Sequence, residues 1–177
     1  MSDTNDLIEQ VKSPNADVRF AAWNSAGAAG AAAVVPLADL MAAPDRDVAK
    51  AAKEAMHRIV HFAARPYGAQ NARAVSAELE KVAVQTERPR IVRVESLKWI
   101  ALVGDNESIP TLVKLLQDPV VREDARLALE RIPGNASLTA LNEAAGTAPA
   151  DFKSNLKQSL SARKVTNKDV EIKINVN

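Results

Sequence analysis

Apolar residues recur along this chain in ten short stretches that have the pattern of amphipathic helices. Leucine, valine and alanine stand three and four positions apart in these stretches, which is the period of a helix with one buried face. We expect first helices at about 4–12, 33–42, 71–85, 107–117 and 137–145, and second helices at about 15–28, 45–64, 89–103, 119–132 and 149–162. The predicted core combines apolar residues of both sets: Val18, Val48, Val92 and Val121 with Leu7, Leu37, Leu40, Leu79, Leu112 and Leu116.

Prolines and glycines mark the turns between these stretches. Pro14, Pro44, Pro89, Pro119 and Pro149 are separated by 30, 45, 30 and 30 residues. Ser13 and Asp118 stand before two of the prolines as candidate N-caps, and Gly30, Gly104 and Gly134 follow 15 or 16 residues after a proline as candidate left-handed C-caps. One hairpin cannot bury its apolar face alone, so the period predicts stacked hairpins. We expect repeats at about 4–30, 31–68, 69–104, 105–134 and 135–162, one array over 1–162, and a tail at 163–177.

Two short motifs return at corresponding places in the repeats. Second helices carry Val18-Arg19, Val92-Arg93 and Val121-Arg122, each with a small residue three positions after the arginine, and first helices carry Val35-Pro36-x-x-x-Leu40 and Ile109-Pro110-x-x-x-x-Leu115. With the acidic proline turns, these motifs resemble HEAT repeats of the short bacterial kind that also occurs in phycobilin lyases. The resemblance implies an all-α, right-handed superhelix, a solenoid of about five helical hairpins, in a family built mostly of adaptors.

Two segments depart from the repeat. The step of 45 residues carries fifteen extra residues around 61–75, which either lengthen two helices or project from a binding edge. In the tail, Val170, Ile172, Ile174 and Val176 alternate with polar residues, which is the period of a strand. Three interpretations stay open for this tail: a flexible end, a strand that pairs with another chain or folds back along the array, or the start of a further domain.

Composition excludes several classes of function. The chain has no Cys, so disulfides and thiolate metal sites are ruled out, and its net charge of +1 gives no overall bias toward nucleic acid or membrane. The acidic start is unlike a signal peptide, and Gly27, Gly30, Pro36 and Asp39 interrupt the longest apolar run. We therefore expect a cytoplasmic protein. Phosphate loops, nucleophile elbows and paired His-Glu metal motifs do not occur, so we expect no enzyme and no cofactor.

Charge separates the two sets of helices. Second helices and their turns carry a net charge of +6, and first helices carry −5. In HEAT-like arrays the second helices line the concave face, so the resemblance implies a basic groove. We expect a non-catalytic protein-protein interaction scaffold that binds an acidic or extended partner segment there, through Arg19, Trp23, Lys53, His57, Arg93 and Arg126. Trp99 aligns with the buried stripe, and for Trp23 we favour packing against the second repeat over a partner contact. For the repeated arginines Arg19, Arg93 and Arg122, we also consider a ladder bridged by Asp17 or Asp124 that ties successive repeats together.

Other activities stay open as alternatives. His57 and His61 lie four apart, with Glu54 on the same face, and could ligate a metal; an exposed, solvated pair is the alternative that we favour. Deoxyhypusine hydroxylases resemble this fold but bind iron through His-Glu dipeptides, whereas in this chain Arg58 and Phe62 follow the histidines. A basic groove could also bind nucleic acid, as in HEAT-like alkylpurine DNA glycosylases, and repeat-level similarity alone suggests a bilin lyase or another small-ligand role.

Overall fold

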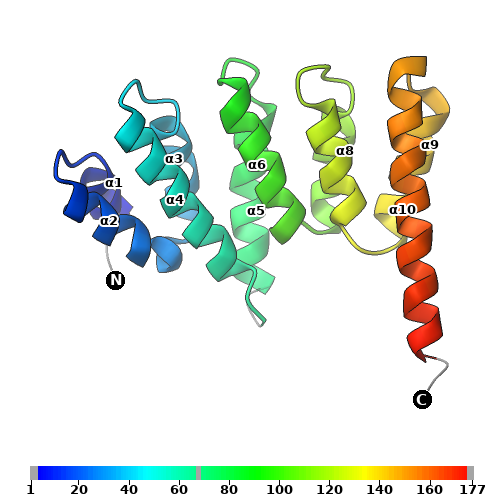
Figure 1. Cartoon of the computed structure of the whole chain (residues 1–177), viewed down its shortest axis with the longest axis horizontal. Coiled ribbons are helices and arrows are strands. Elements are labelled where there is room, and N and C mark those ends of the chain that lie inside the picture. The colour runs from blue at the N-terminus through cyan, green and yellow to red at the C-terminus, as the bar shows by residue number, and fades with distance from the viewer. Residues whose placement is uncertain (1–3, 67–68, 175–177) are drawn as a thin grey trace. The chain divides into compact units, whose positions relative to one another are not determined.

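The chain is all-α wherever the structure describes it (Figure 1). The computed structural model describes the backbone of residues 4–66 and 69–174, and the side chains of this range except those of residue 69 and of residues 165–174. Two compact units divide the chain: Met1–Gly104 (unit 1) and Asp105–Asn177 (unit 2). Within each unit, helical hairpins pack against one another in chain order, which confirms the predicted hairpin architecture.

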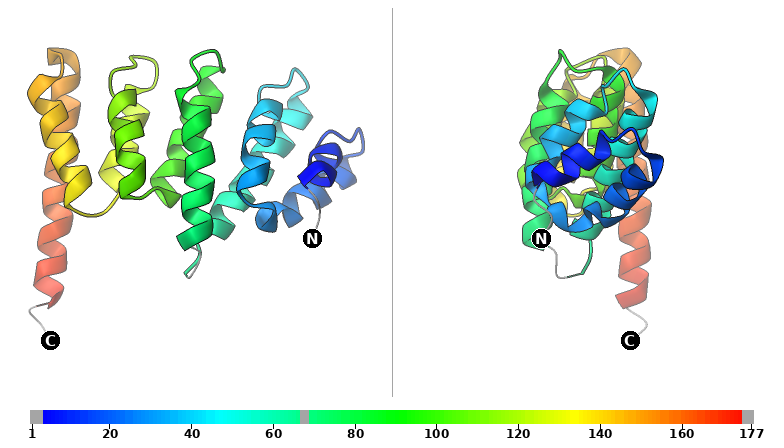
Figure 2. Two further views of the ribbon diagram at one scale, coloured as in Figure 1. Left: turned by 180° about the vertical axis from the view of Figure 1, so that it is seen from behind. Right: turned by 90° about the vertical axis from the view of Figure 1, so that its left-hand side faces the viewer.

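Unit 1 contains three hairpins. They pair α1 (Thr4–Val11) with α2 (Ala16–Ser25), α3 (Val34–Leu40) with α4 (Arg46–Ala63), and α5 (Ala69–Val84) with α6 (Arg90–Val103). Two short 3-10 helices, η1 (Ala26–Ala29) and η2 (Ala31–Ala33), connect the first hairpin to the second. The second helices of successive hairpins lie side by side, α2 against α4 and α4 against α6 (Figure 1), and the view from behind has the first helices of these hairpins in front (Figure 2).

Unit 2 contains two hairpins. Its elements are η3 (Asn106–Ser108), α7 (Ile109–Leu115), α8 (Arg122–Arg131), α9 (Asn135–Thr147) and α10 (Ala150–Ile174). Helix α8 packs against α7 of its own hairpin and against both α9 and α10 of the next. Among the described residues, no helix combines the length and the apolar character that a membrane crossing requires.

Polar caps begin several helices, although not all at the predicted residues. The N-cap of α2 is Asn15 rather than Ser13, because the Asn15 side chain accepts a hydrogen bond from the backbone N–H of Asp17 at 2.8 Å. Asp45 caps α4 in the same way. Of the three candidate glycine C-caps, Gly30 and Gly134 have positive φ angles of 68° and 95°, but their ψ angles of −157° and 175° lie outside the left-handed helical region. Gly134 stands before α9, and the C-cap of α8 is Ile132 instead. Gly104 lacks a positive φ angle, because its backbone is extended, at φ −71° and ψ 154°.

The predicted core is largely confirmed. Val48, Val92 and Val121 are buried, as are the leucines named with them except Leu40, which is half-buried. Val18 is wrong as a core residue, because 36% of it is exposed. It lies on α2 in the first hairpin. Trp99 is only 4% exposed, which confirms it as a core residue.

The extra residues between Pro44 and Pro89 lengthen two helices. Helix α4 has 18 residues and α5 has 16, whereas the second helices α2 and α8 have 10 each. The lengthening that we considered for this segment is therefore observed, and a role of the segment in binding stays a prediction. Residues 67 and 68 of its predicted turn lie outside the described residues.

The strand-like tail predicted at 163–177 is corrected by the structure. Helix α10 crosses residue 162 and continues to Ile174, and residues 175–177 lie outside the described range. A helix satisfies its backbone hydrogen bonds within one segment, whereas a lone strand in a helical unit finds no partner for them. The alternation of apolar and polar residues is therefore overridden by the continuing helix.

Candidate partner-binding surface

Two of the predicted binding arginines are buried. Arg93 is 2% exposed, and its Nε donates to the carbonyl oxygen of Ala83 in α5 at 2.9 Å. Arg126 is 8% exposed and is held between carboxylates of its own helix. Neither guanidinium presents its charge to solvent, so these two residues do not belong to a binding face.

Arg19 and Arg122 instead join neighbouring hairpins. Arg19 donates to the carbonyl oxygens of Ser13 and Pro14, and its Nη2 lies 3.0 Å from Asp47 Oδ2 in the next hairpin. Arg122 contacts Asp151 of the following hairpin in unit 2 at 2.5 Å, which lowers the pKa of that carboxyl group. These contacts are the ladder between repeats that we considered, and its bridging carboxylates include Asp47 and Asp151 of the next hairpins.

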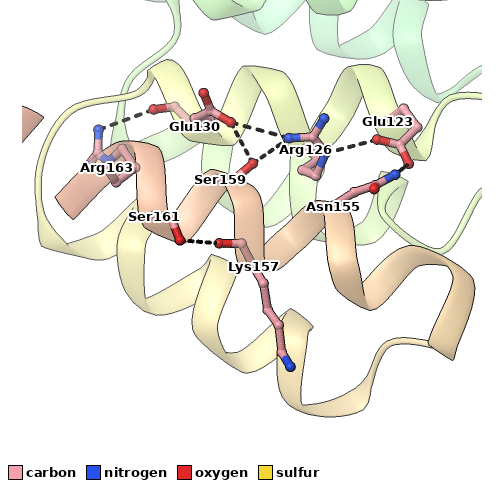
Figure 3. Close-up of polar contacts among 8 residues, drawn as sticks. All are labelled: Glu123, Arg126, Glu130, Asn155, Lys157, Ser159, Ser161 and Arg163. Carbon is pink, nitrogen blue, oxygen red and sulfur yellow. Dashed lines mark hydrogen bonds and ion pairs between the residues drawn. The ribbon is translucent and has the colours of Figure 1, made fainter. Parts of the chain in front are cut away.

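In unit 2, a polar cluster joins α8 to α10 (Figure 3). Arg126 Nε donates to Glu123 at 2.9 Å, and its Nη1 contacts both Glu130 and Ser159. Ser159 donates to Glu130 at 2.6 Å, and Asn155 donates to Glu123. The arginine therefore has partners on both helices, and the cluster stabilises their packing.

Arg163 closes the other end of the α8–α10 contact. Its guanidinium donates to the carbonyl oxygens of Glu130, Ile132 and Gly134, where α8 ends, at 3.3, 2.9 and 2.7 Å. A cation at the carbonyl end of a helix also interacts favourably with the helix dipole. The sequence places Arg163 at the start of the tail and gives no sign of this role, because only tertiary packing brings it to the α8–α9 turn.

Lys53, another predicted binding residue, forms an ion pair but stays partly exposed. Its Nζ lies 3.3 Å from Glu95 Oε2 on α6, and Lys98 contacts the other oxygen of the same carboxylate at 3.0 Å. Glu95 is thus shared by two lysines, while 47% of the Lys53 side chain stays exposed. Lys53 can reach a partner, but its charge is already partly neutralised.

A group of basic residues without ion pairs lies on α4 and the turn after it; among the described residues of unit 2, Lys114, Arg131, Lys153, Lys157 and Lys164 also lack ion pairs. Arg46, Lys50, Arg58 and Arg65 are exposed, and none of them has a carboxylate within 4.0 Å among the described residues. Sequence reasoning missed Arg58 and Arg65 as individual binding residues, because it counted them only in the overall charge. A signal for them was available, since residues 55–77 contain no Asp or Glu.

Helices α2 and α4 form a shared face that carries two hollows. The smaller, of about 120 Å³, is lined by Ala16, Arg19, Trp23, Asp47 and Lys50. The larger, of about 400 Å³, lies where α4 ends and is lined by Asn24, Ser25, Gly27, Ala28, Arg58, His61, Phe62 and Arg65. We call the face that contains both hollows the α2–α4 surface. Within each hollow, residues of α4 stand three positions apart, Asp47 with Lys50 and Arg58 with His61, so each pair lies on one side of the helix.

Trp23, for which we considered a role as a partner anchor, lines the smaller hollow of this surface. It is half-buried, and its ring packs edge-on against Phe20, with 5.6 Å between ring centroids. Phe20 is 57% exposed. Tryptophan and arginine side chains that are partly buried in a hollow are the groups that most often dominate protein interfaces.

His57 and His61 lie together at the edge of this surface. Their ring centroids are 4.1 Å apart. Partial burial, and next the charge of His61, lower the pKa of His57 below its usual 6.5. Within the described residues, no group of three or more His, Asp or Glu side chains is arranged to hold a metal ion, so the pair has no third ligand.

Comparisons with known proteins agree with the repeat architecture. A family model described as HEAT repeats matches residues 76–161. That segment is therefore similar to HEAT repeats, whereas the narrower likeness to phycobilin lyases stays a prediction. No curated protein matches the chain.

Among solved structures, the similar ones include engineered repeat proteins. One is an engineered protein whose crystal structure was a structural genomics target. Its sequence is 20% identical to this chain, the alignment covers 92% of this chain and 79% of that chain, and the TM-score is 0.45. A designed armadillo repeat protein in complex with the peptide (KR)4 is 21% identical, with 90% and 81% covered, at a TM-score of 0.45. A computationally designed armadillo repeat protein for modular peptide recognition gives the same identity and coverage, at 0.46. Likenesses this distant assign no function to this chain.

Proposed function

We propose that this chain is a non-catalytic protein-binding scaffold, and that the α2–α4 surface of unit 1 holds an acidic, extended segment of its partner. Repeat proteins of stacked hairpins bind partners along the exposed faces of successive helices. The observation that carries the proposal is the uneven neutralisation of the basic residues. Arg19, Arg93 and Arg126 are taken up by partners inside their units, whereas Lys50, Arg58 and Arg65 are not.

The dimensions of the surface suit a short extended peptide. Lys50 and Arg65 are fifteen positions apart on α4 and the turn after it, which corresponds to about 22 Å at the rise of an α-helix. An extended chain advances about 3.3 Å per residue, so roughly seven residues would span this length. Trp23 lines the hollow near one end, and the two arginines line the hollow near the other. An acidic segment would therefore meet an aromatic contact and at least three cations.

Electrostatic attraction gives this binding a recognisable dependence on salt. Exposed charges interact over about 10 Å at 0.1 M ionic strength, and less as salt rises. We therefore expect acidic peptides to associate more weakly as the salt concentration increases. The affinity of a neutral peptide of the same length should fall much less over the same range of salt concentration.

A peptide array tests the proposal. The purified chain is incubated with octapeptides of acidic, neutral and basic composition, and retained peptides are measured by fluorescence anisotropy. We expect enrichment of Asp and Glu, and loss of binding in Trp23→Ala and Lys50→Glu. Lys157→Glu on α10 makes the same change of charge in unit 2 at an exposed residue, and serves as the matched control.

Two outcomes would contradict the proposal. An array without preference for acidic peptides would remove its basis, and so would a Lys157→Glu variant that loses binding as much as Lys50→Glu does. Duplex DNA bound at low salt more tightly than the acidic peptides would favour the nucleic-acid alternative, because a phosphate backbone responds to the same cations.

A further inference from the structure

We propose that the 400 Å³ hollow at the end of α4 is a site for an oxyanion, a carboxylate or phosphoryl group carried by the partner segment. The inference rests on the proposed function and gives it a specific contact. It concerns one end of the α2–α4 surface, away from Trp23 and Lys50, so the two proposals can fail separately.

One wall of the hollow is entirely basic or aromatic. Arg58, His61 and Arg65 stand at intervals of three and four positions, so their side chains project from one side of α4 and its final turn. No acidic residue lines the hollow. Neither arginine has a carboxylate within 4.0 Å among the described residues, so their charge is available to a ligand.

Phe62 holds one of these arginines in place. The guanidinium carbon of Arg65 lies 4.4 Å from the centroid of the Phe62 ring. A guanidinium stacked on a ring keeps its N–H donors at its edge, and this planar fork matches the geometry of carboxylate and phosphate oxygens. The stacking thus positions donors for an oxyanion before the ligand arrives.

The opposite wall is uncharged and close. It consists of Asn24, Ser25, Gly27 and Ala28, from the end of α2 and from η1. The amide of Asn24 is exposed and makes no hydrogen bond within the described residues, so it can donate to an anion without competing with it. A Cβ atom at Gly27 would lie 3.1 Å from Cδ2 of Phe62, so glycine permits the close approach that shapes the hollow.

This combination fits an anion better than other ligands. A cation would be repelled by Arg58 and Arg65, and a metal ion would find no carboxylate ligand in the hollow. A purely apolar group would leave two guanidinium groups and an amide without partners. An oxyanion on a peptide satisfies the donors, and the remaining space accommodates the adjoining backbone.

Three labelled octapeptides test the site. They share one sequence and differ at a single central position, which holds phosphoserine, aspartate or serine, so that the first two arms distinguish a phosphoryl group from a carboxylate. Binding to the full chain is measured by fluorescence anisotropy for the wild type, for Arg58→Gln and Arg65→Gln, and for Arg46→Gln. Arg46 is the matched control, because it is an exposed arginine without a carboxylate partner on the same helix and lines neither hollow.

We expect Arg58→Gln and Arg65→Gln each to raise the Kd of at least one anionic peptide by about tenfold. The serine peptide should change by less than about twofold, and so should every peptide with Arg46→Gln. In the wild type, the anionic peptide should also shift the backbone amide NMR signals of Asn24, Gly27 and Ala28. This second measurement needs no substitution and therefore does not depend on the folding of a variant.

Three results would overturn the site. One is an equal loss with Arg46→Gln, which would indicate a general charge effect. Another is unchanged binding in Arg58→Gln and Arg65→Gln while Trp23→Ala and Lys50→Glu abolish it; the scaffold would then survive without this site. The third is a complete lack of binding of both anionic peptides by the wild type, which would refute the scaffold proposal as well.

Discussion

Replacing Arg126 by Met tests whether this residue stabilises unit 2 or serves a partner. Methionine keeps most of the aliphatic stem and removes the guanidinium. The change breaks the contacts with Glu123 at 2.9 Å and Glu130 at 3.3 Å, and the contact with Ser159. It leaves two carboxylates facing each other beside a buried hydroxyl group.

The magnitude follows from how exposed the remaining partners are. Breaking a fully buried ion pair costs about 3–5 kcal/mol. In this cluster the side chains of Glu130 and Glu123 are 26% and 43% exposed, so water takes over part of the lost contacts. We therefore expect a loss of about 2 kcal/mol in the free energy of unfolding of unit 2.

Amide hydrogen exchange measures this loss locally. A change of about 2 kcal/mol corresponds to roughly 30-fold faster exchange of the protected amides in α8 and α10. Arg131→Met is the control, because Arg131 lies on the same helix, is exposed and has no ion pair among the described residues. Adding Glu130→Gln to Arg126→Met should recover part of the loss, since it removes one of the two uncompensated charges.

An unchanged exchange rate together with weaker peptide binding would support the prediction from sequence that Arg126 binds a partner. If exchange in Arg126→Met stays within about threefold of the wild type, the guanidinium contributes little to packing. If binding of acidic peptides falls at the same time, Arg126 contacts the partner, and its role as a packing residue between α8 and α10 is refuted.

Three further predictions concern other parts of the chain. Arg163→Ala should lower the free energy of unfolding by about 1–2 kcal/mol, measured by urea denaturation with circular dichroism; an equal loss in its exposed neighbour Lys164→Ala would refute a specific role. Gly27→Ala should cost about 1 kcal/mol by tryptophan fluorescence, because its Cβ meets a ring at 3.1 Å, whereas Gly146→Ala, which has open space, should not destabilise. Because the pKa of His57 lies below 6.5, the stability that this histidine contributes is complete above pH 6.5 and falls as the pH drops through the folded pKa. The urea midpoint should therefore depend less on pH in His57→Gln than in the wild type, and an equal dependence in the two proteins would contradict this.

The candidate surface could be predicted only in part. Trp23, Lys53 and His57 were named from their positions on second helices, and the structure places them on exposed or half-exposed parts of α2 and α4. Arg58 and Arg65 were missed. What distinguishes these two arginines is that no acidic residue lies near them. The sequence shows this for neighbours on the same helix, but not for neighbours on other helices.

The sequence by itself determined the helices and their turns. Helical period, proline and glycine act through neighbours a few positions away, so nine of the ten predicted helices and the start of α10 were located within a few residues wherever residues are described. Tertiary structure decided which charged side chains form contacts inside the fold and which stay exposed. Val18-Arg19 and Val92-Arg93 share one motif, yet Arg19 bridges to the next hairpin and Arg93 is buried against α5.

The same distinction explains the tail and the buried clusters. Local alternation favoured a strand after residue 163, but a strand needs a neighbour, and the chain continues α10 instead. The partners of Arg126 and Arg163 lie on other helices as well as nearby in the chain, up to 33 residues away. Whether a basic side chain stabilises the fold or stays available to a partner depends on such distant contacts, and therefore only packing settles it.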